Sequence, residues 1–182
     1  WVVPGMLILP NASSLTGGVQ AIAAATNATC AVVNGALQCA GNNATGQLGN
    51  NSTADSATPV KPTLGLVDSM TAGVFHTCAL LDDASLWCWG ANDYGQVGDS
   101  STIDRLTPAQ VGLTGTQQVS AGAYHTCAVS GSGVARCWGR NAGGRLGDGT
   151  TTDRSNPTRV VGVSGVGQIA AGVHHTCAIT SA

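Results

Sequence analysis

The chain has 182 residues, of which only 9% are charged and 26 are glycine, and its formal net charge is −2 at pH 7. Few charges and many glycines favour short strands joined by tight turns, so we expect a mostly β domain. The slightly acidic balance lacks the basic footprint of a nucleic-acid-binding protein. No apolar run approaches the ~20 residues that cross a bilayer, so we expect no membrane span in this segment.

An internal repeat of 49 residues organises the chain. Pro10, Pro59, Pro108 and Pro157 follow this spacing, and so do Gly46, Gly95 and Gly144 and Cys39, Cys88 and Cys137. Short strands with a period in the forties are typical of β-propeller blades. We expect one run of about 3.7 repeats: the end of a preceding blade at 1–21, repeats at 22–69, 70–118 and 119–168, and a truncated repeat at 169–182. A β-solenoid, or an open arc that forms filaments, is the alternative.

Each repeat contains four candidate strands. In chain order they are an Ala-Gly-x-x-His-Thr-Cys segment, a Cys-Trp-Gly segment, the stretch that enters the periodic proline, and a Val- or Ile-containing stretch before the next repeat. Glycine, proline, asparagine and aspartate separate them, which is the composition of turns.

The turn chemistry sets the pairing of the first two strands. Asn34-Gly35 is a two-residue hairpin signal, and pairing outward from it places Cys30 opposite Cys39. The next two hairpins centre on Asp83 and Ser132 with three-residue loops, in which Gly133 suits the left-handed position. These hairpins place Cys78 opposite Cys88 and Cys127 opposite Cys137.

We expect these three cysteine pairs to be disulfides. Directly opposed residues of antiparallel strands have Cβ atoms roughly 4.5–5.5 Å apart, close to what a disulfide requires. The eight or nine residues between the members of a pair do not match the short knuckles of zinc sites. Disulfides indicate an oxidising, extracellular or cell-surface location. Cys177 has no partner at the same spacing within the chain, so it is a candidate for an intermolecular disulfide or for a partner outside this segment.

Two segments carry a resemblance to a known family. They read Cys88-Trp89-Gly90-Ala91-Asn92-Asp93-Tyr94-Gly95-Gln96-Val97-Gly98-Asp99 and Cys137-Trp138-Gly139-Arg140-Asn141-Ala142-Gly143-Gly144-Arg145-Leu146-Gly147-Asp148-Gly149-Thr150. Together with the Ala-Gly-x-x-His-Thr-Cys-Ala strand they resemble the repeats of the regulator-of-chromosome-condensation family. The resemblance implies a β-propeller, usually of seven blades. The cysteine-bearing form is similar to exported members of the family.

No residue set points to catalysis. His76, His125 and His175 recur at one repeat position, as do Trp89 and Trp138 at another, so we expect packing roles for them. Asp99, Asp104, Asp148 and Asp153 accompany glycine and threonine and are expected to cap turns rather than bind calcium. We predict no enzyme, no cofactor and no metal site.

Two surface features are uneven along the chain. Glycosylation triplets begin at Asn11, Asn27, Asn43 and Asn51, with an overlapping one at Asn50, and none follows position 53. Arg136, Arg140, Arg145, Arg154 and Arg159 supply five of the seven basic residues, and we expect a solvated face with Asp148 and Asp153 as local partners.

The function that these observations favour is an exported, non-catalytic propeller module that binds a protein partner, further copies of itself or the remainder of its own polypeptide. A structural subunit of a surface filament or layer, joined through incomplete terminal blades, is the alternative. A nuclear guanine-nucleotide exchange factor, which the family resemblance also implies, is disfavoured by the cysteine pairs and by the lack of a basic tail.

Overall fold

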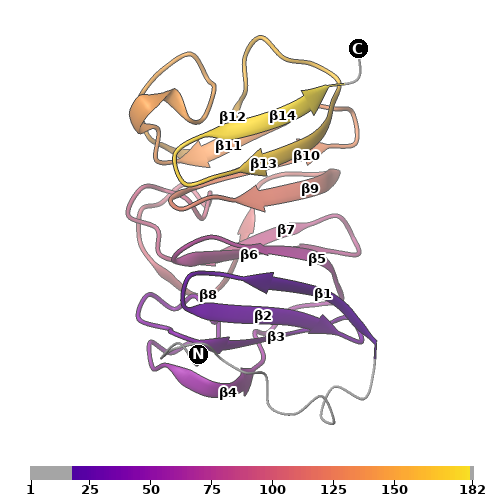
Figure 1. Ribbon diagram of the computed structural model, residues 1–182, viewed down its shortest axis with the longest axis vertical. Coiled ribbons are helices and arrows are strands. Elements are labelled where there is room, and N and C mark those ends of the chain that lie inside the picture. Colours follow the sequence, from indigo (N-terminus) through magenta and orange to yellow (C-terminus); the bar gives the residue numbers. More distant parts are fainter. Residues whose placement is uncertain (1–17, 181–182) are drawn as a thin grey trace, which may run out of the picture.

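The computed structural model describes residues 18–180, which form four antiparallel sheets stacked in chain order along the long axis (Figure 1). The first sheet contains β1 (Val19–Ala24), β2 (Ala28–Val33), β3 (Ala36–Gly41) and β4 (Ser56–Val60). The second contains β5 (Val67–Ala72), β6 (His76–Leu81), β7 (Leu86–Gly90) and β8 (Arg105–Val111). The third contains β9 (Thr116–Ala121), β10 (His125–Ser130), β11 (Ala135–Gly139) and β12 (Arg154–Arg159). The fourth pairs β13 (Val166–Ala171) with β14 (Thr176–Thr180).

Each sheet is a meander, because every strand pairs with the strand that follows it in the chain. The first strands of successive sheets, β1, β5, β9 and β13, contact one another, so the sheets meet along these strands. The predicted all-β class is confirmed. The β-solenoid alternative is wrong, because a solenoid would place strands of successive repeats in shared sheets. Within residues 18–180, no helix is long and apolar enough to cross a membrane.

The sheets begin three residues earlier than the repeat boundaries drawn from the sequence. Their first strands start at 19, 67, 116 and 166, whereas the boundaries lay at 22, 70, 119 and 169. The Val- or Ile-containing stretch was assigned partly to the end of each repeat. This stretch is instead the first strand of the next sheet. It pairs there with the Ala-Gly-x-x-His-Thr-Cys strand, as Val67 does with Leu81.

The hairpins between the second and third strands have the predicted loops. Asn34 and Gly35 both have positive φ, 53° and 74°, as a type I′ turn requires. In the second sheet the Leu81 N–H donates to Ser85 O at 3.0 Å, which closes a three-residue loop. Gly133 has φ 73°, and Ala84 occupies the matching position with φ 61°.

Each of these hairpins contains a disulfide. Cys30–Cys39, Cys78–Cys88 and Cys127–Cys137 are bonded, each with Cα atoms 4.1 Å apart. They are the pairs that the hairpin register sets opposite each other. All six cysteines are buried, whereas Cys177 on β14 is free and exposed.

The hydrophobic core consists of three clusters, each shared by two neighbouring sheets. Trp89 of the second sheet packs in the cluster that contains Val32 and Leu48 of the first repeat, and Trp138 of the third sheet packs with Val97 of the second. A Cβ atom at Gly49 would lie 2.7 Å from Trp89 Nε1, and one at Gly98 would lie 2.5 Å from Trp138 Nε1. The glycines therefore make room for the tryptophan of the next sheet.

Ala84 is in a left-handed conformation that costs an L-residue free energy and costs glycine almost none. We expect Ala84→Gly to raise the free energy of unfolding by about 1 kcal/mol in urea titrations. The matched change Gly133→Ala should lower it by more, because a Cβ there would also lie 2.9 Å from Gly165 Cα. A lower stability for Ala84→Gly would contradict the strain assigned to this loop.

Candidate functional site

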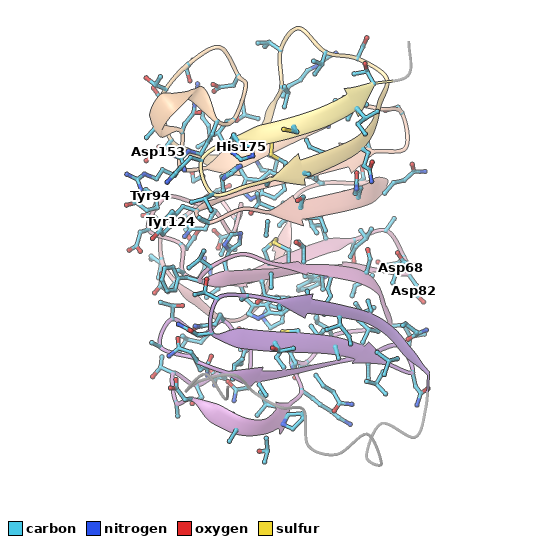
Figure 2. The ribbon with its side chains drawn as sticks, viewed as in Figure 1. Asp68, Asp82, Tyr94, Tyr124, Asp153 and His175 are labelled. Atoms are coloured by element: carbon cyan, nitrogen blue, oxygen red, sulfur yellow. A yellow bond between two sulfur atoms is a disulfide. The ribbon has the colours of Figure 1, made fainter. Side chains whose placement is uncertain are left out.

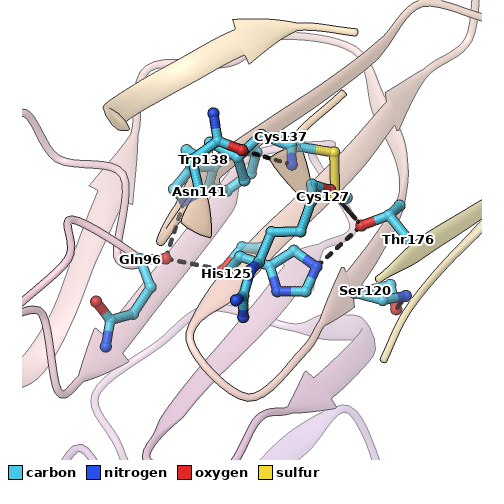
Figure 3. The surroundings of a disulfide bond; sticks show 12 residues. Gln96, Ser120, His125, Cys127, Cys137, Trp138, Asn141 and Thr176 are labelled. Carbon is cyan, nitrogen blue, oxygen red and sulfur yellow. Dashed lines mark hydrogen bonds between the residues drawn. A yellow bond between two sulfur atoms is a disulfide. The ribbon is translucent and has the colours of Figure 1, made fainter. Parts of the chain in front are cut away.

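A loop carbonyl of the first sheet and one of the second each accept two side-chain hydrogen bonds from the next sheet. Gln96 O accepts from Thr126 Oγ1 at 2.8 Å and from Trp138 Nε1 at 2.9 Å (Figure 3). Gln47 O accepts from Thr77 Oγ1 and Trp89 Nε1, both at 2.9 Å. The tryptophans thus have a structural role in joining sheets.

The buried histidines belong to the same junctions. His76 Nε2 lies 2.9 Å from Thr126 Oγ1, and His125 Nε2 lies 2.9 Å from Thr176 Oγ1. Because the single hydroxyl proton of Thr126 goes to Gln96 O, the His76 Nε2 must be the donor, which fixes the tautomer. The Nδ1 atom of His76 then carries no hydrogen and can only accept a hydrogen bond. It has no hydrogen-bond partner among the described residues.

The environment keeps both buried histidines neutral. Burial first, and the charge of His125 second, lower the pKa of His76 to about 3. Burial first, and the charge of Arg145 second, lower the pKa of His125 to about 4. His175, at the equivalent position on the fourth sheet, is exposed. The three side chains come from successive repeats and belong to no group of three His, Cys, Asp or Glu side chains that could hold a metal ion among residues 18–180.

Asparagine and aspartate side chains hold the long loops after the third strands. Asn92 Nδ2 donates to Ile103 O at 3.1 Å, and Asn92 Oδ1 accepts from the Val97 N–H at 2.9 Å. Asp104 Oδ1 accepts the Asn92 N–H at 2.8 Å, and Asp153 does the same for Asn141 at 2.6 Å. These aspartates cap turns. Among residues 18–180, no group of three His, Cys, Asp or Glu side chains is arranged to hold a metal ion.

Two loop aspartates also pair with arginines. Asp99 pairs with Arg105, and Asp148 Oδ2 lies 2.8 Å from Arg154 Nε. Burial opposes the ionisation of Asp148, but hydrogen bonds from Thr150 and Arg154 outweigh it and hold the pKa of Asp148 below its usual value. The same balance, with Ser101 and Arg105 as donors, lowers the pKa of Asp99.

The possible glycosylation site Asn43 lies inside the folded chain. Asn43 is fully buried, and its Nδ2 donates to Asn50 Oδ1, Ser52 O and Ala54 O. A glycan on this nitrogen would break these bonds. Asn27 and Asn51 are exposed, and Asn11 lies outside the described residues.

The five clustered arginines do not form one solvated face. Arg145 is only 8% exposed and donates to Ala142 O and Val173 O. Burial first, and the charge of Arg140 second, lower the pKa of Arg145, whereas Asp153 raises it. Arg154 is paired, while Arg140 contacts aromatic rings instead of an acid. The prediction of a shared solvated face is wrong.

Arg140 belongs to a cluster in which two residues, Arg140 and Tyr94, depart from the repeat. We define the aromatic–arginine cluster as Phe75, Tyr94, Tyr124 and Arg140. The position of Arg140 is held by asparagine and alanine in the two earlier repeats, and that of Tyr94 is held by threonine in the first. These departures were visible in the sequence, but nothing there brought them together.

The cluster forms where four loops meet: those between β5 and β6, β7 and β8, β9 and β10, and β11 and β12. The guanidinium carbon of Arg140 lies 4.9 Å from the Tyr94 ring centre and 5.6 Å from that of Tyr124. The Tyr94 and Tyr124 rings meet edge to face at 5.5 Å, and Phe75 lies 6.0 Å from Tyr124. All four side chains are half-buried.

The cluster marks one of two opposite sides of the molecule. Tyr94, Tyr124 and Asp153 lie on one side of the stacked sheets, and Asp68 and Asp82 lie on the other (Figure 2). We call the first side the loop face. It presents the only cation–aromatic contacts found within residues 18–180.

Stacked antiparallel meanders, joined through the carbonyls of Gln47 and Gln96, define a protein of the β-propeller repeat class. The model of the regulator of chromosome condensation (RCC1) repeat matches residues 83–129 and 136–179, and a second model of this repeat matches residues 67–96 and 117–145. The chain belongs to the RCC1 repeat family, as its motifs indicate. No curated protein sequence matches it.

Several solved structures share the fold. Human WBSCR16 matches with a TM-score of 0.80 at 24% identity over 90% of this chain and 45% of its own. Yeast RCC1 (Prp20), solved bound to Kap60, matches with a TM-score of 0.80 at 22% identity over 91% of this chain and 42% of its own. The ectodomain of the Arabidopsis thaliana receptor kinase ACR4 matches with a TM-score of 0.55 at 18% identity over 92% of this chain and 47% of its own. The chain thus spans less than half of each of these structures.

Removing the Thr126 hydroxyl tests the junction between the second and third sheets. Thr126→Val keeps the shape but leaves the buried His76 Nε2–H without an acceptor, so we expect a loss of about 2 kcal/mol in the free energy of unfolding. The exposed Thr102→Val is the matched control and should stay within about 0.5 kcal/mol of the parent. Equal stability of both variants would show that the Thr126 hydroxyl does not stabilise the junction between these sheets.

The buried histidines also make stability depend on pH. Their folded pKa values, about 3 for His76 and about 4 for His125, lie below the unfolded value of 6.5, so the unfolded state binds more protons between these limits. Stability should be complete above pH 6.5 and should fall as pH decreases toward 3, by roughly 1 to 3 kcal/mol per pH unit. Denaturant titrations between pH 7 and 4 measure this slope. A flat profile in the parent protein would contradict the buried, neutral state.

Proposed function

We propose that this chain is part of an exported, non-catalytic β-propeller that binds a protein partner through its loop face. The observation that carries the proposal is the aromatic–arginine cluster, in which Tyr94 and Arg140, two residues that depart from the repeat, contact each other on one side of the molecule. Aromatic residues and arginine are enriched at the centres of protein interfaces. Repeated residues hold the blades together, so the departures are free to serve recognition.

Export is supported by the three disulfides, because thiols are kept reduced in the cytosol and nucleus. The fold likeness to the ectodomains of plant receptor kinases agrees with it. Asn27 and Asn51 are exposed and available to carry glycans after export.

Alkylation of the native protein without reductant should then modify Cys177 at most. Modification of all seven cysteines would contradict the proposed export.

A binding role rather than a catalytic one is supported by the state of the titratable groups. His76 and His125 are buried and bonded within the sheet junctions, and the loop aspartates cap turns or pair with arginines. Catalysis requires a nucleophile or base within reach of a substrate. These groups are already committed to the fold.

A structural subunit is the second candidate. Among the described residues β14 pairs on one side only, with β13, and Ile179 on it is 64% exposed. An unpaired edge strand is a template for another strand, and the exposed Cys177 on the same strand could be joined covalently to a neighbour. A role as a nuclear exchange factor has less support. The chain shares only the fold of yeast Prp20p, whose structure was described with its binding to Gsp1p and histones.

Site-directed photo-crosslinking in the native source tests the choice of face. A photoreactive phenylalanine analogue at Tyr94 replaces one half-buried aromatic ring by another, and we expect it to crosslink one protein partner. The same analogue at exposed Asp82, on the opposite side (Figure 2), should crosslink little or nothing.

Each alternative predicts a different pattern. Crosslinks from Asp82 but not from Tyr94 would place the partner on the wrong side for this proposal. Crosslinks found only from a third site, Ile179, and only to further copies of the chain would favour the structural subunit.

A further inference from the structure

We propose that the aromatic–arginine cluster is a carboxylate-binding site, at which an aspartate or glutamate side chain of the protein partner docks on Arg140. This inference rests on the proposed function, since it assigns the chemistry that the loop face recognises. It is carried by an oriented arginine with unused donors and by a buried amide beside it that also lacks a partner.

The fold holds Arg140 in place from both ends. Its backbone N–H donates to Tyr124 O at 2.8 Å, directly after the last residue of β11. Its guanidinium carbon then lies over the Tyr94 and Tyr124 rings, at 4.9 and 5.6 Å. These contacts use the charge of the guanidinium and none of its five N–H groups. The cation is therefore oriented before any ligand arrives.

The side-chain donors of Arg140 are not used within residues 18–180. Its side chain makes no hydrogen bond and no ion pair with any residue in the described range 18–180, where the two ion pairs are Arg105–Asp99 and Arg154–Asp148. The nearby carboxylate of Asp153 is engaged by the Asn141 N–H. Arginine forks match carboxylates with two parallel hydrogen bonds.

A second unused donor lies beside the cluster. Gln96 is fully buried and its Nε2 has no partner among the described residues. In the first repeat the equivalent Gln47 Nε2 donates to Asn42 Oδ1 at 2.7 Å, but Ala91 replaces that asparagine in the second repeat. Gln96 Oε1 accepts the Tyr94 N–H at 3.0 Å.

The position of Gln96 links it to Arg140 as well as to Tyr94. Its Cβ lies 3.1 Å from where a Cβ would stand on Gly139, the residue before Arg140. A buried amide donor that has lost its internal acceptor, next to an unpaired guanidinium, fits an incoming acceptor with two oxygens.

The charge balance favours a carboxylate over a more highly charged anion. Arg145 is the next cation, but it is buried and its donors bond Ala142 O and Val173 O. Asp93 and Asp153 are exposed acids on the same loops. One free cation among acids suits one negative charge, and the surrounding rings supply the apolar contact that a side-chain ligand brings.

The test is an NMR titration of the whole, disulfide-intact protein with the peptide acetyl-Ala-Glu-Glu-Ala-amide, which needs no knowledge of the partner. We expect saturable shifts of the Arg140 Nε–H and Gln96 Nε2 resonances. The matched peptide with glutamine in place of glutamate should cause none. Arg140→Gln should weaken glutamate-peptide binding at least about tenfold, a loss of about 1.4 kcal/mol. The control Arg159→Gln, an exposed arginine on β12, should leave binding unchanged.

Three results would overturn the inference: equal shifts from the glutamine peptide, unchanged binding by Arg140→Gln, or saturation of Arg140 by inorganic phosphate where the glutamate peptide has no effect. If Arg140→Gln unfolds, Arg140→Lys carries the test, because it keeps the charge, loses the fork and should bind more weakly than the parent. Failure here with intact crosslinking from Tyr94 would spare the proposed function. Peptide binding without such crosslinks would refute the proposed function alone.

Discussion

The hydrogen bonds to one loop carbonyl per blade are the constraint on which the structure depends. Gln96 O accepts from Thr126 and Trp138 of the next sheet, and this leaves the Thr126 oxygen free to accept from His76. The histidine-threonine strand and the tryptophan strand therefore contribute to the same contact, in which Thr126 and Trp138 share one carbonyl acceptor. Since Gln47 O makes the equivalent two bonds with Thr77 and Trp89, the contact accounts for the period of the threonine and tryptophan motifs without any reference to a ligand.

The residues that depart from the repeat do not make the side-chain hydrogen bonds that their equivalents make in the first repeat. In the first repeat Thr45 and Asn42 both bond to Gln47, whereas the equivalent positions around Gln96 hold Tyr94 and Ala91. These changes leave an amide without an acceptor and add aromatic surface on the loop face. A change that removes an internal hydrogen bond and gains none inside the protein is expected at a site that serves binding.

Short-range chemistry explains how much the sequence could predict. The Asn34-Gly35 turn sets its hairpin register, and with it the position of Cys30 opposite Cys39, because turn type and strand pairing are local. The first strand of each sheet begins three residues before the repeat boundary drawn from the sequence, because periodicity shows where a motif recurs and not which neighbour a strand pairs with. The sequence places Asn43 and Arg145 at the surface, but both are buried: Asn43 bonds within its own loop, and Arg145 bonds to Val173 of the next sheet's loop. The aromatic–arginine cluster could not be predicted because it joins four loops that are distant in the chain.

The central claim is that repeated residues build the fold while the departures on the loop face bind a partner. Hydrogen–deuterium exchange of the protein, alone and with its captured partner, tests this claim most directly. The account predicts added protection in the loops 73–75, 91–94, 122–124 and 140–145, with none at the hairpin loops 82–84 and 131–133 on the opposite side. Protection confined to those hairpins, or to β14, would contradict it.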